Sequence, residues 1–322
     1  MSDSDEVANT RALRKISVVI PVYNSVSTLA ELVRRLNTVL TSLDREFELV
    51  LVDDCSPDGS WRVLTELKLS PEYGPRLKIA ALTRNSGQHN ALLCGLTLAT
   101  GGVIVTMDDD LQNPPEELPR LVAAVDAGFD LAIAAYEHKQ HSAARNASGG
   151  LVDGVLRRIF KLPRGFQLTS FRAVSRAVVA NVIRMGGAYP YVTSMLLSHT
   201  SSYVNVMVRH DPRPAGRSNY SIHRSTSLAL NLILHYSSYP VYALMAACAL
   251  AMIFSLAFSS MVLVHALVNG SGVPGWASTV IIISCFNTVN LLGLLVFGLY
   301  LSRILQQITH TRVNFTIGAL HE

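Results

Sequence analysis

The sequence predicts an α/β fold with a mainly parallel sheet, followed by interfacial helices and two transmembrane helices. Three observations lead to this prediction. Short apolar runs alternate with stretches of helical spacing between Ile16 and Ala135. Polar residues follow directly after several of those runs. Residues 240–302 are almost uncharged, although charged residues make up 16% of the chain. Apolar strands that alternate with helices are typical of a parallel sheet covered on both faces.

The alternation defines the expected elements of one α/β domain over residues 15–221. Strands are expected at Ile16–Ile20, Phe47–Val52, Leu77–Leu82, Val103–Met107 and Asp130–Ala135. Helices are expected at Val26–Leu43, around Trp61–Leu69, at Gln88–Thr100 and at Glu116–Ala127. The helices are indicated by apolar residues spaced three and four apart, with glycines after two of them.

Polar side chains stand at the carboxyl ends of four expected strands, where open α/β sheets bind ligands. They are Tyr23-Asn24, Asp53-Asp54, Arg84-Asn85 and Asp108–Asp110. The chain has no GxGxxG after its first strand and no GxxxxGK[ST], which excludes the common dinucleotide and P-loop sites. The net charge is only +4 and no long basic run occurs, so nucleic acid is not expected as a partner.

The acidic run from Asp108 to Asp110 follows a buried strand directly. Side chains two apart on an extended segment point the same way, so Asp108 and Asp110 are expected to hold one hard cation. Gln112 is expected to add a carbonyl oxygen. Mg²⁺ or Mn²⁺, bound by one or two carboxylates together with substrate phosphates, is the predicted cofactor. The alternative is an acidic surface turn before Asn113-Pro114-Pro115.

Two uncharged apolar runs, Val241–Val264 and Ala277–Leu301, are each long enough to cross about 30 Å of hydrocarbon as a helix. The alternative is a pair of buried helices in a soluble core. Basic residues flank the pair on its outer sides, which places both termini and the α/β domain in the cytoplasm. The acidic N-terminus lacks the features of a signal peptide.

The remaining segments complete the expected organisation. Residues 1–14 are expected to be disordered, and residues 222–239 to form a juxtamembrane amphipathic helix. Leu151–Phe160 places apolar residues on one face with basic residues after it. That pattern suits a helix in the lipid interface or one packed on the core. Residues 303–322 are expected to be a cytoplasmic C-terminal segment.

Five stretches resemble the inverting family-2 glycosyltransferases of the glycosyltransferase-A fold. They are SVVIPVYN (17–24), ELVLVDDCSPDGS (48–60), LTRNSGQHNALLCGL (82–96), VTMDDDLQNPPEELPRLV (105–122) and HDPRPAGRSNYS (210–221). Together with the following spans, they resemble the polyprenyl-phosphate branch in particular. This resemblance implies a membrane-bound enzyme that transfers a sugar from a nucleotide-diphosphate sugar, UDP-sugar favoured, to polyprenyl (undecaprenyl) phosphate. It also implies a homo-oligomer in the bacterial cytoplasmic membrane that serves cell-envelope glycan modification.

The resemblance also implies roles for donor-side residues. The base and ribose would be lined by Pro21, Tyr23 and Asn24. A hydrogen bond from the base would be accepted by Asp53, with Asp54 in support. Further contacts to the nucleotide-sugar would come from Arg84, Asn85, Asp108 and Asp109. The metal on the diphosphate would be held by Asp108, Asp110 and Gln112.

The acceptor side is carried by residues 210–221, which resemble the HxxRxxGxSxY loop of the branch. Arginine is suited to bidentate contact with phosphate. The predicted phosphate ligands are Arg213, which is also expected to act in catalysis, and Ser218, with Arg145 and Lys139 as further candidates. The alternative for this stretch is an ordinary Pro/Gly surface loop with solvated arginines.

Three positions depart from the family pattern. Ser25 replaces the Glu of PxYNE, Asn219 replaces a Lys, and Phe166 stands where an acid often precedes the GFR-like motif, here GFQLTSFR (165–172). A phosphate acceptor has its second pKa at about 6 and is largely ionised at neutral pH, so a general base is less necessary. We expect catalysis with inversion to rest on positioning by arginines and metal-assisted departure of the diphosphate.

Two other functions are compatible with parts of the pattern. A processive polysaccharide synthase would carry a QxxRW-type motif and more spans, and neither Trp61 nor Trp276 lies in such a motif. A non-catalytic membrane scaffold or lipid transporter would retain a degenerate transferase domain, but the intact Asp108 and Asp110 argue against it.

Overall fold

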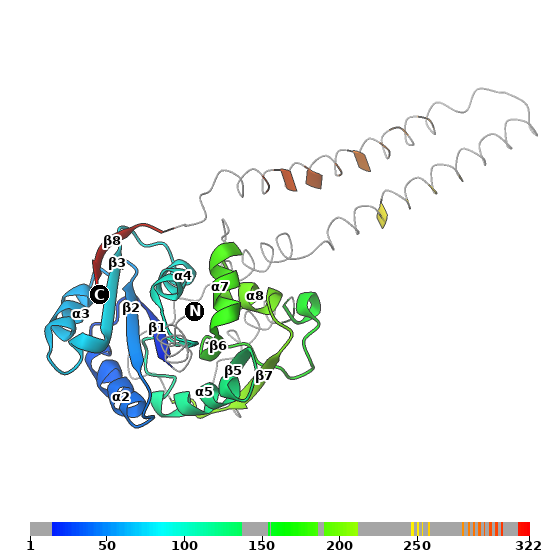
Figure 1. Cartoon of the computed structure of the whole chain (residues 1–322). Coiled ribbons are helices and arrows are strands. Elements are labelled where there is room, and N and C mark those ends of the chain that lie inside the picture. Colours follow the sequence, from blue (N-terminus) through cyan, green and yellow to red (C-terminus); the bar gives the residue numbers. More distant parts are fainter. Residues whose placement is uncertain are drawn as a thin grey trace, which may run out of the picture. The chain divides into compact units, whose positions relative to one another are not determined.

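The structure is a computed structural model that describes residues 15–136, 154, 156–185, 190–211 and 315–322, together with single helical positions between 246 and 304. The chain divides into two units, residues 1–225 with 310–322, and residues 226–309. The labelled elements of Figure 1 belong to the first unit.

The described residues of the first unit form an eight-stranded sheet with the order β7-β5-β6-β4-β1-β2-β3-β8. The strands are β1 (Ile16–Val22), β2 (Phe47–Asp53), β3 (Leu77–Leu82), β4 (Val103–Thr106), β5 (Leu131–Ala135), β6 (Arg172–Ser175), β7 (Tyr203–Met207) and β8 (Ile317–His321). Strands β1 to β4 pair in parallel, as do β5 and β7, whereas β6 and β8 run antiparallel to their neighbours. The prediction of a mainly parallel sheet is confirmed.

Helices cover both faces of this sheet (Figure 1). They are α2 (Leu29–Thr41), α3 (Ser60–Leu69), α4 (Gln88–Leu98), α5 (Leu118–Asp126), α7 (Arg176–Met185) and α8 (Val192–Ser198), with 3₁₀ turns η1 (Gly74–Arg76) and η2 (Pro115–Glu117). Helices α2, α3 and α5 pack on one face in the first core cluster, and α4, α7 and α8 pack on the other face in the second. Successive strand residues point to opposite faces, so Val18 and Ile20 join the first cluster and Val19 the second.

Most predicted elements are confirmed with shifted ends. Helix α2 begins at Leu29 rather than Val26, because the residues before it form turns. The expected helix Glu116–Ala127 is the 3₁₀ turn η2 followed by α5. Strands β6, β7 and β8 were not among the expected elements. The C-terminal segment contains β8, which pairs with β3 and forms one edge of the sheet.

Several predicted segments lie outside the described residues. These are residues 1–14, 137–150, 212–239 and most of the two expected spans. The single positions described within the spans are helical. Of the helices that the described residues form, none combines the length and apolarity of a transmembrane span. In the segment Leu151–Phe160, Leu156 is fully buried and Phe160 packs against the second core cluster, so these two residues pack on the core.

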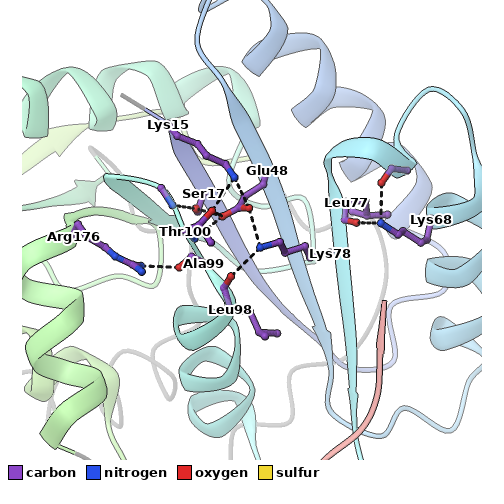
Figure 2. Close-up of polar contacts among 12 residues, drawn as sticks. Lys15, Ser17, Glu48, Lys68, Leu77, Lys78, Leu98, Ala99, Thr100 and Arg176 are labelled. Atoms are coloured by element: carbon purple, nitrogen blue, oxygen red, sulfur yellow. Dashed lines mark hydrogen bonds and ion pairs between the residues drawn. The ribbon is translucent and has the colours of Figure 1, made fainter. Parts of the chain in front are cut away.

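Glu48 is buried at the N-terminal ends of the parallel strands (Figure 2). Its carboxylate accepts hydrogen bonds from Lys15 Nζ (2.7 Å), from Ser17 Oγ (2.6 Å) and from the N–H and hydroxyl of Thr100, and Lys78 Nζ lies 3.3 Å away. Burial raises the pKa of a carboxyl, but these donors hold the pKa of Glu48 at about 2. The cluster joins β1, β2, β3 and the segment before β4, and so aligns the strands that carry the site at their other ends.

Candidate active site

The predicted donor-side residues meet at the carboxyl ends of the parallel strands. Tyr23 follows β1, Asp53 ends β2, and Asp108 stands two residues after β4. Hydrogen bonds between the loops, in addition to the strand order, bring these segments together. The site is therefore built by contacts between loops that are far apart in sequence.

The Asp109 carboxylate binds the loop after β1. Its Oδ2 accepts hydrogen bonds from the backbone N–H of Tyr23 (3.0 Å) and from the Ser25 hydroxyl. Burial raises the pKa of Asp109 to about 6; the Ser25 and Tyr23 donors oppose this shift, and the charges of Asp108 and Asp110 add to it. Asp109, expected to face the donor, thus also holds the loop that carries Tyr23.

Three further N–H groups of the β1–α2 loop donate hydrogen bonds to side chains of the β2–α3 loop and of the first residue of α3. These hydrogen bonds join the Asn24 N–H to Ser56 Oγ (3.2 Å), the Ser25 N–H to Ser60 Oγ (3.0 Å) and the Val26 N–H to Asp58 Oδ2 (3.1 Å). Asn24 has a positive φ of 57°, which Asn tolerates better than most residues. The side chains of Tyr23 and Asn24 remain exposed on this loop, whose backbone is held by these hydrogen bonds.

Two predicted donor residues are buried at the strand ends. Asp53 accepts hydrogen bonds from the Ser56 N–H (3.2 and 3.3 Å), and burial raises the pKa of Asp53. Pro21 lies within β1, paired with Val52, and is buried. Pro21 therefore supports the Tyr23 loop from the sheet, with little of its own surface exposed.

Asp54 organises the loop between β3 and α4. Its two carboxylate oxygens accept hydrogen bonds from the N–H groups of Ser86 (2.6 Å) and Gly87 (2.8 Å). Burial raises the pKa of Asp54, and these two N–H donors oppose the shift. The same loop carries Arg84 and Asn85, whose side chains are exposed. Asp54 thus acts on the predicted donor contacts indirectly, through the backbone.

Asp108 and Asp110 are half-buried, and each is oriented by hydrogen bonds. Asp108 accepts from Gln88 Nε2 (2.7 Å) at Oδ1 and from the Ser170 hydroxyl at Oδ2. Asp110 Oδ1 accepts from the N–H of Gln112 (3.1 Å), which closes a tight turn after β4. Both predicted metal ligands are therefore held in fixed directions at the edge of the site.

This arrangement fits a hard divalent cation. Burial raises the pKa of Tyr136, and the charges of Asp108 and Asp110 add to this shift. No group of three His, Cys, Asp or Glu within the described part of the chain is arranged to hold a metal. Two carboxylates need further oxygen ligands, which a bound diphosphate provides, as is usual for Mg²⁺ at phosphate sites.

Three consecutive residues attach the start of the predicted acceptor motif beside this turn. The attachments are Arg209 Nε to Glu117 Oε1 (2.8 Å), the His210 ring to the Tyr136 ring (centroids 4.4 Å apart) and the Asp211 N–H to the Gln112 carbonyl (3.0 Å). The predicted phosphate residues themselves lie outside the described residues: Arg213, Ser218, Arg145 and Lys139, together with Asn219.

Phe166 is a core residue rather than a site residue. Its side chain is 8% exposed and contacts the Tyr203 ring edge-on, with centroids 5.0 Å apart. Ser170 and Arg172 of the same GFQLTSFR stretch reach the site region instead. Neither was among the predicted site residues. The sequence pattern that could have identified them is the pair of polar residues on either side of Phe171, at the start of strand β6.

Known proteins resemble this chain in sequence and in fold. Residues 17–179 match glycosyl transferase family 2. The chain is 31% identical over 297 residues to an undecaprenyl-phosphate 4-deoxy-4-formamido-L-arabinose transferase of Klebsiella pneumoniae (strain 342), covering 91% of this chain and 89% of that relative. It is 29% identical over 303 residues to a transferase of the same name from Edwardsiella ictaluri, covering 92% of each.

A solved structure shares the fold at low sequence identity. Glucosyl-3-phosphoglycerate synthase from Mycobacterium tuberculosis, crystallised with Mn²⁺, uridine diphosphate and phosphoglyceric acid, matches with a TM-score of 0.51 and 21% identity, over 71% of this chain and 80% of that one. The residues of this chain that match the family run from β1 into α7 and include the loops that carry Asp53 and Asp108. The Rossmann-like glycosyltransferase-A fold is thereby confirmed, and the chain belongs to glycosyl transferase family 2.

Proposed function

We propose that this glycosyltransferase transfers a sugar from a nucleotide-diphosphate sugar, UDP-sugar favoured, to undecaprenyl or another polyprenyl phosphate. The product is a polyprenyl-monophosphate sugar for cell-envelope glycan modification. Similarity over more than 90% of this chain to transferases named for undecaprenyl phosphate supports the acceptor class. The observation that carries the proposal is the pair of oriented carboxylates, Asp108 and Asp110, at the carboxyl end of β4.

The donor occupies the loops after β1, β2 and β3. Tyr23 and Asn24 line the base and ribose with exposed side chains on a loop fixed at both sides. Asp53 accepts a hydrogen bond from the base. Arg84 and Asn85, exposed at the start of the β3–α4 loop, lie near the donor. Arginine beside a diphosphate is the usual charge complement in such sites.

Asp108 and Asp110 would hold Mg²⁺ or Mn²⁺, with Gln112 as a third ligand. The cation would supply charge neutralisation for the departing nucleotide diphosphate. An oxygen of the acceptor phosphate attacks the anomeric carbon in line, the bond from that carbon to the diphosphate oxygen breaks, and the configuration inverts. The attacking oxygen is already ionised at neutral pH, since the second pKa of a phosphomonoester is about 6. Burial of Phe166 agrees with a mechanism that uses no acid at that position.

The acceptor phosphate is bound by Arg213 and Ser218, with Arg145 and Lys139 as further cations. Arg213 neutralises the attacking phosphate and holds it in line with the scissile bond. The attachment of residues 209–211 next to Gln112 supports this arrangement, because the loop that follows begins beside the metal turn.

The enzyme is integral to the bacterial cytoplasmic membrane through two helices in residues 240–302. A juxtamembrane helix at residues 222–239 precedes them, and the catalytic domain and both termini are cytoplasmic. In the second unit, several of the described large apolar side chains are exposed, among them Leu250 (67%), Ile253 (62%), Ile283 (60%) and Phe297 (66%). Exposed apolar side chains on helices suit contact with lipid or with another copy in a homo-oligomer.

The test is a transfer assay with the purified full chain in detergent. Undecaprenyl phosphate, Mn²⁺ or Mg²⁺ and a panel of UDP- and GDP-sugars are incubated, and nucleotide diphosphate release and glycolipid formation are measured. We expect transfer to require lipid, metal and Asp110. Transfer should be unchanged in the control variant Asp126→Ala, on the outer surface of α5. No turnover and no metal-dependent donor binding would instead favour a non-catalytic scaffold or lipid transporter. Repeated sugar addition would favour a processive synthase.

A further inference from the structure

Arg172, the first residue of β6, is buried and makes its described hydrogen bonds to neutral groups. Its side chain is 1% exposed. Nε donates to the Thr106 hydroxyl (3.1 Å), and Nη1 donates to the Thr193 hydroxyl (2.9 Å). Burial lowers the pKa of Arg172 to about 10, while electrostatic interactions with Tyr191 and Asp108 act in the opposite direction. The guanidinium is therefore a buried cation at neutral pH.

A buried charge without a hydrogen-bonded carboxylate is unfavourable for folding. Arg172 nonetheless lies between β4 and α8 among the apolar residues of the second core cluster, such as Ile104 and Val192. An apolar side chain of similar length would avoid this penalty. Natural sequences accept such local penalties mostly at functional sites, so the contacts of Arg172 indicate what the guanidinium does.

A chain of hydrogen bonds leads from Arg172 to Asp108. The Thr106 hydroxyl accepts from Arg172 and donates its own proton to the Ser170 carbonyl (2.8 Å). The Ser170 hydroxyl in turn donates to Asp108 Oδ2. A hydroxyl has one proton to donate, so the Arg172 contact favours the Thr106 orientation that points at Ser170. The segment that carries Ser170 is thereby held against β4.

We propose that Arg172 is a positioning residue for the metal site. Through Thr106 and Ser170, it fixes the orientation of the Asp108 carboxylate. This inference rests on the proposed role of Asp108 and Asp110 in holding Mg²⁺ or Mn²⁺. Arg172 acts on Asp108 through two intervening residues, Thr106 and Ser170, and has no assigned contact with donor or acceptor. Its contact with Thr193 fastens α8 to the same network.

The second donor to Asp108 comes from the start of α4. Gln88 Nε2 donates to Oδ1, and its neighbour His89 packs edge-on against Tyr191, with ring centroids 4.7 Å apart. Burial, followed by the charge of Arg172, lowers the pKa of His89 to about 4, so this imidazole is neutral at pH 7. Of these two side chains, Arg172 is therefore the one that carries a positive charge at pH 7.

The positive charge of Arg172 allows two possible roles to be distinguished by metal affinity: an effect of the charge alone, and positioning of Asp108. A cation repels a bound metal ion, so a residue that acted only through its charge would weaken metal binding, and its removal would strengthen it. A positioning residue has the opposite effect, because a misdirected ligand binds metal less well. Outer partners of metal ligands commonly contribute about 10- to 100-fold in metal affinity.

The test is the affinity for Mn²⁺ in the presence of UDP, measured by calorimetry on the full chain in detergent. Arg172→Met, Thr106→Val and Ser170→Ala are each expected to weaken Mn²⁺ binding by about 10- to 100-fold. Arg172→Lys, which keeps the charge and part of the donor set, is expected to recover part of the loss. Unchanged or tighter Mn²⁺ binding in Arg172→Met would overturn the proposal.

Arg176→Met is the matched control. Arg176, the first residue of α7, donates from Nη1 to the Ala99 carbonyl (2.7 Å) near the Glu48 cluster (Figure 2). This variant is expected to lose thermal stability and to keep its Mn²⁺ affinity. If Arg172→Met does not fold, Thr106→Val and Ser170→Ala decide the outcome. A wild-type chain that binds no Mn²⁺ with UDP rejects the proposed function, whereas wild-type binding with unaltered variants rejects this inference alone.

Discussion

The Ser25 hydroxyl donates a hydrogen bond to Oδ2 of Asp109, the same oxygen that accepts the backbone N–H of Tyr23. The contact joins the loop after β1 to the loop after β4. It depends on a serine at a position where the family pattern has glutamate. A glutamate there would bring a second carboxylate towards Asp109, whose pKa burial already raises to about 6. The serine instead provides a neutral donor, which stabilises the ionised form of Asp109.

Ser25→Ala is expected to weaken UDP binding in the presence of Mn²⁺ by about tenfold, because a hydrogen bond to a charged group contributes roughly 1.5–3 kcal/mol. The reason is that the Tyr23 loop loses one of its attachments. Calorimetric titration of UDP measures the effect. Ser42→Ala, which removes an exposed hydroxyl bonded to the Val39 carbonyl, is the control and is expected to bind as wild type. Equal affinities in the two variants would show that the contact does not support the donor site.

Asp54→Ala is expected to raise the KM for the donor sugar by about tenfold, with a smaller effect on kcat. The N–H groups of Ser86 and Gly87 lose their acceptors, so the loop that presents Arg84 is no longer held. Steady-state kinetics with varied donor concentration measures both constants. Asp126→Ala on α5 serves as the control. A fall in kcat with unchanged KM would contradict an indirect role at the donor site.

Glu48→Gln is expected to reduce stability at neutral pH by about 3 kcal/mol. The pKa of Glu48 lies at about 2 in the fold, below its ordinary value of 4.5. A depressed carboxyl pKa stabilises the fold above the ordinary pKa, and this contribution disappears as the pH falls from about 4.5 towards 2. Thermal unfolding followed by tryptophan fluorescence at several pH values measures the difference between wild type and variant. That difference should shrink below pH 4.5.

The control for this prediction is Glu31→Gln, since Glu31 forms an exposed ion pair with Arg34 on α2. Exposed pairs contribute little, so this variant should unfold almost as wild type does. A pH-independent difference between wild type and Glu48→Gln would mean that packing, and not ionisation, accounts for the effect of residue 48.

Removal of residues 317–322 is expected to lower thermal stability and to promote association of the catalytic domain. Strand β8 covers the edge of β3, and an uncovered edge offers unpaired N–H and carbonyl groups to other chains. Thermal unfolding and size-exclusion chromatography measure the two effects. His321→Ala removes only the ring contact with Trp61 (centroids 5.9 Å apart) and keeps the strand. Equal thermal stability and equal association of the truncated chain and His321→Ala would contradict a role for strand pairing.

Sequence periodicity determined the alternation of β1 to β4 with their helices. It also determined the position of Asp108 and Asp110 after a buried strand, where the structure has them. Both are local properties: side-chain spacing reports which face of a helix or strand is buried. The same reasoning brought Tyr23, Asp53 and Asp108 to one edge of the sheet, because parallel strands end at the same edge.

The tertiary structure alone decided which side chains orient that edge. The Ser170 contact to Asp108 spans 62 positions, and the Ser25 contact to Asp109 spans 84. Strand β6 enters antiparallel between β4 and β5, and this pairing places Arg172 opposite Thr106 and leaves Phe166 in the core. Strand pairing of this kind depends on which edges and faces remain available once the whole chain has packed. That is a property of contacts distant in sequence, which no local pattern of residues encodes.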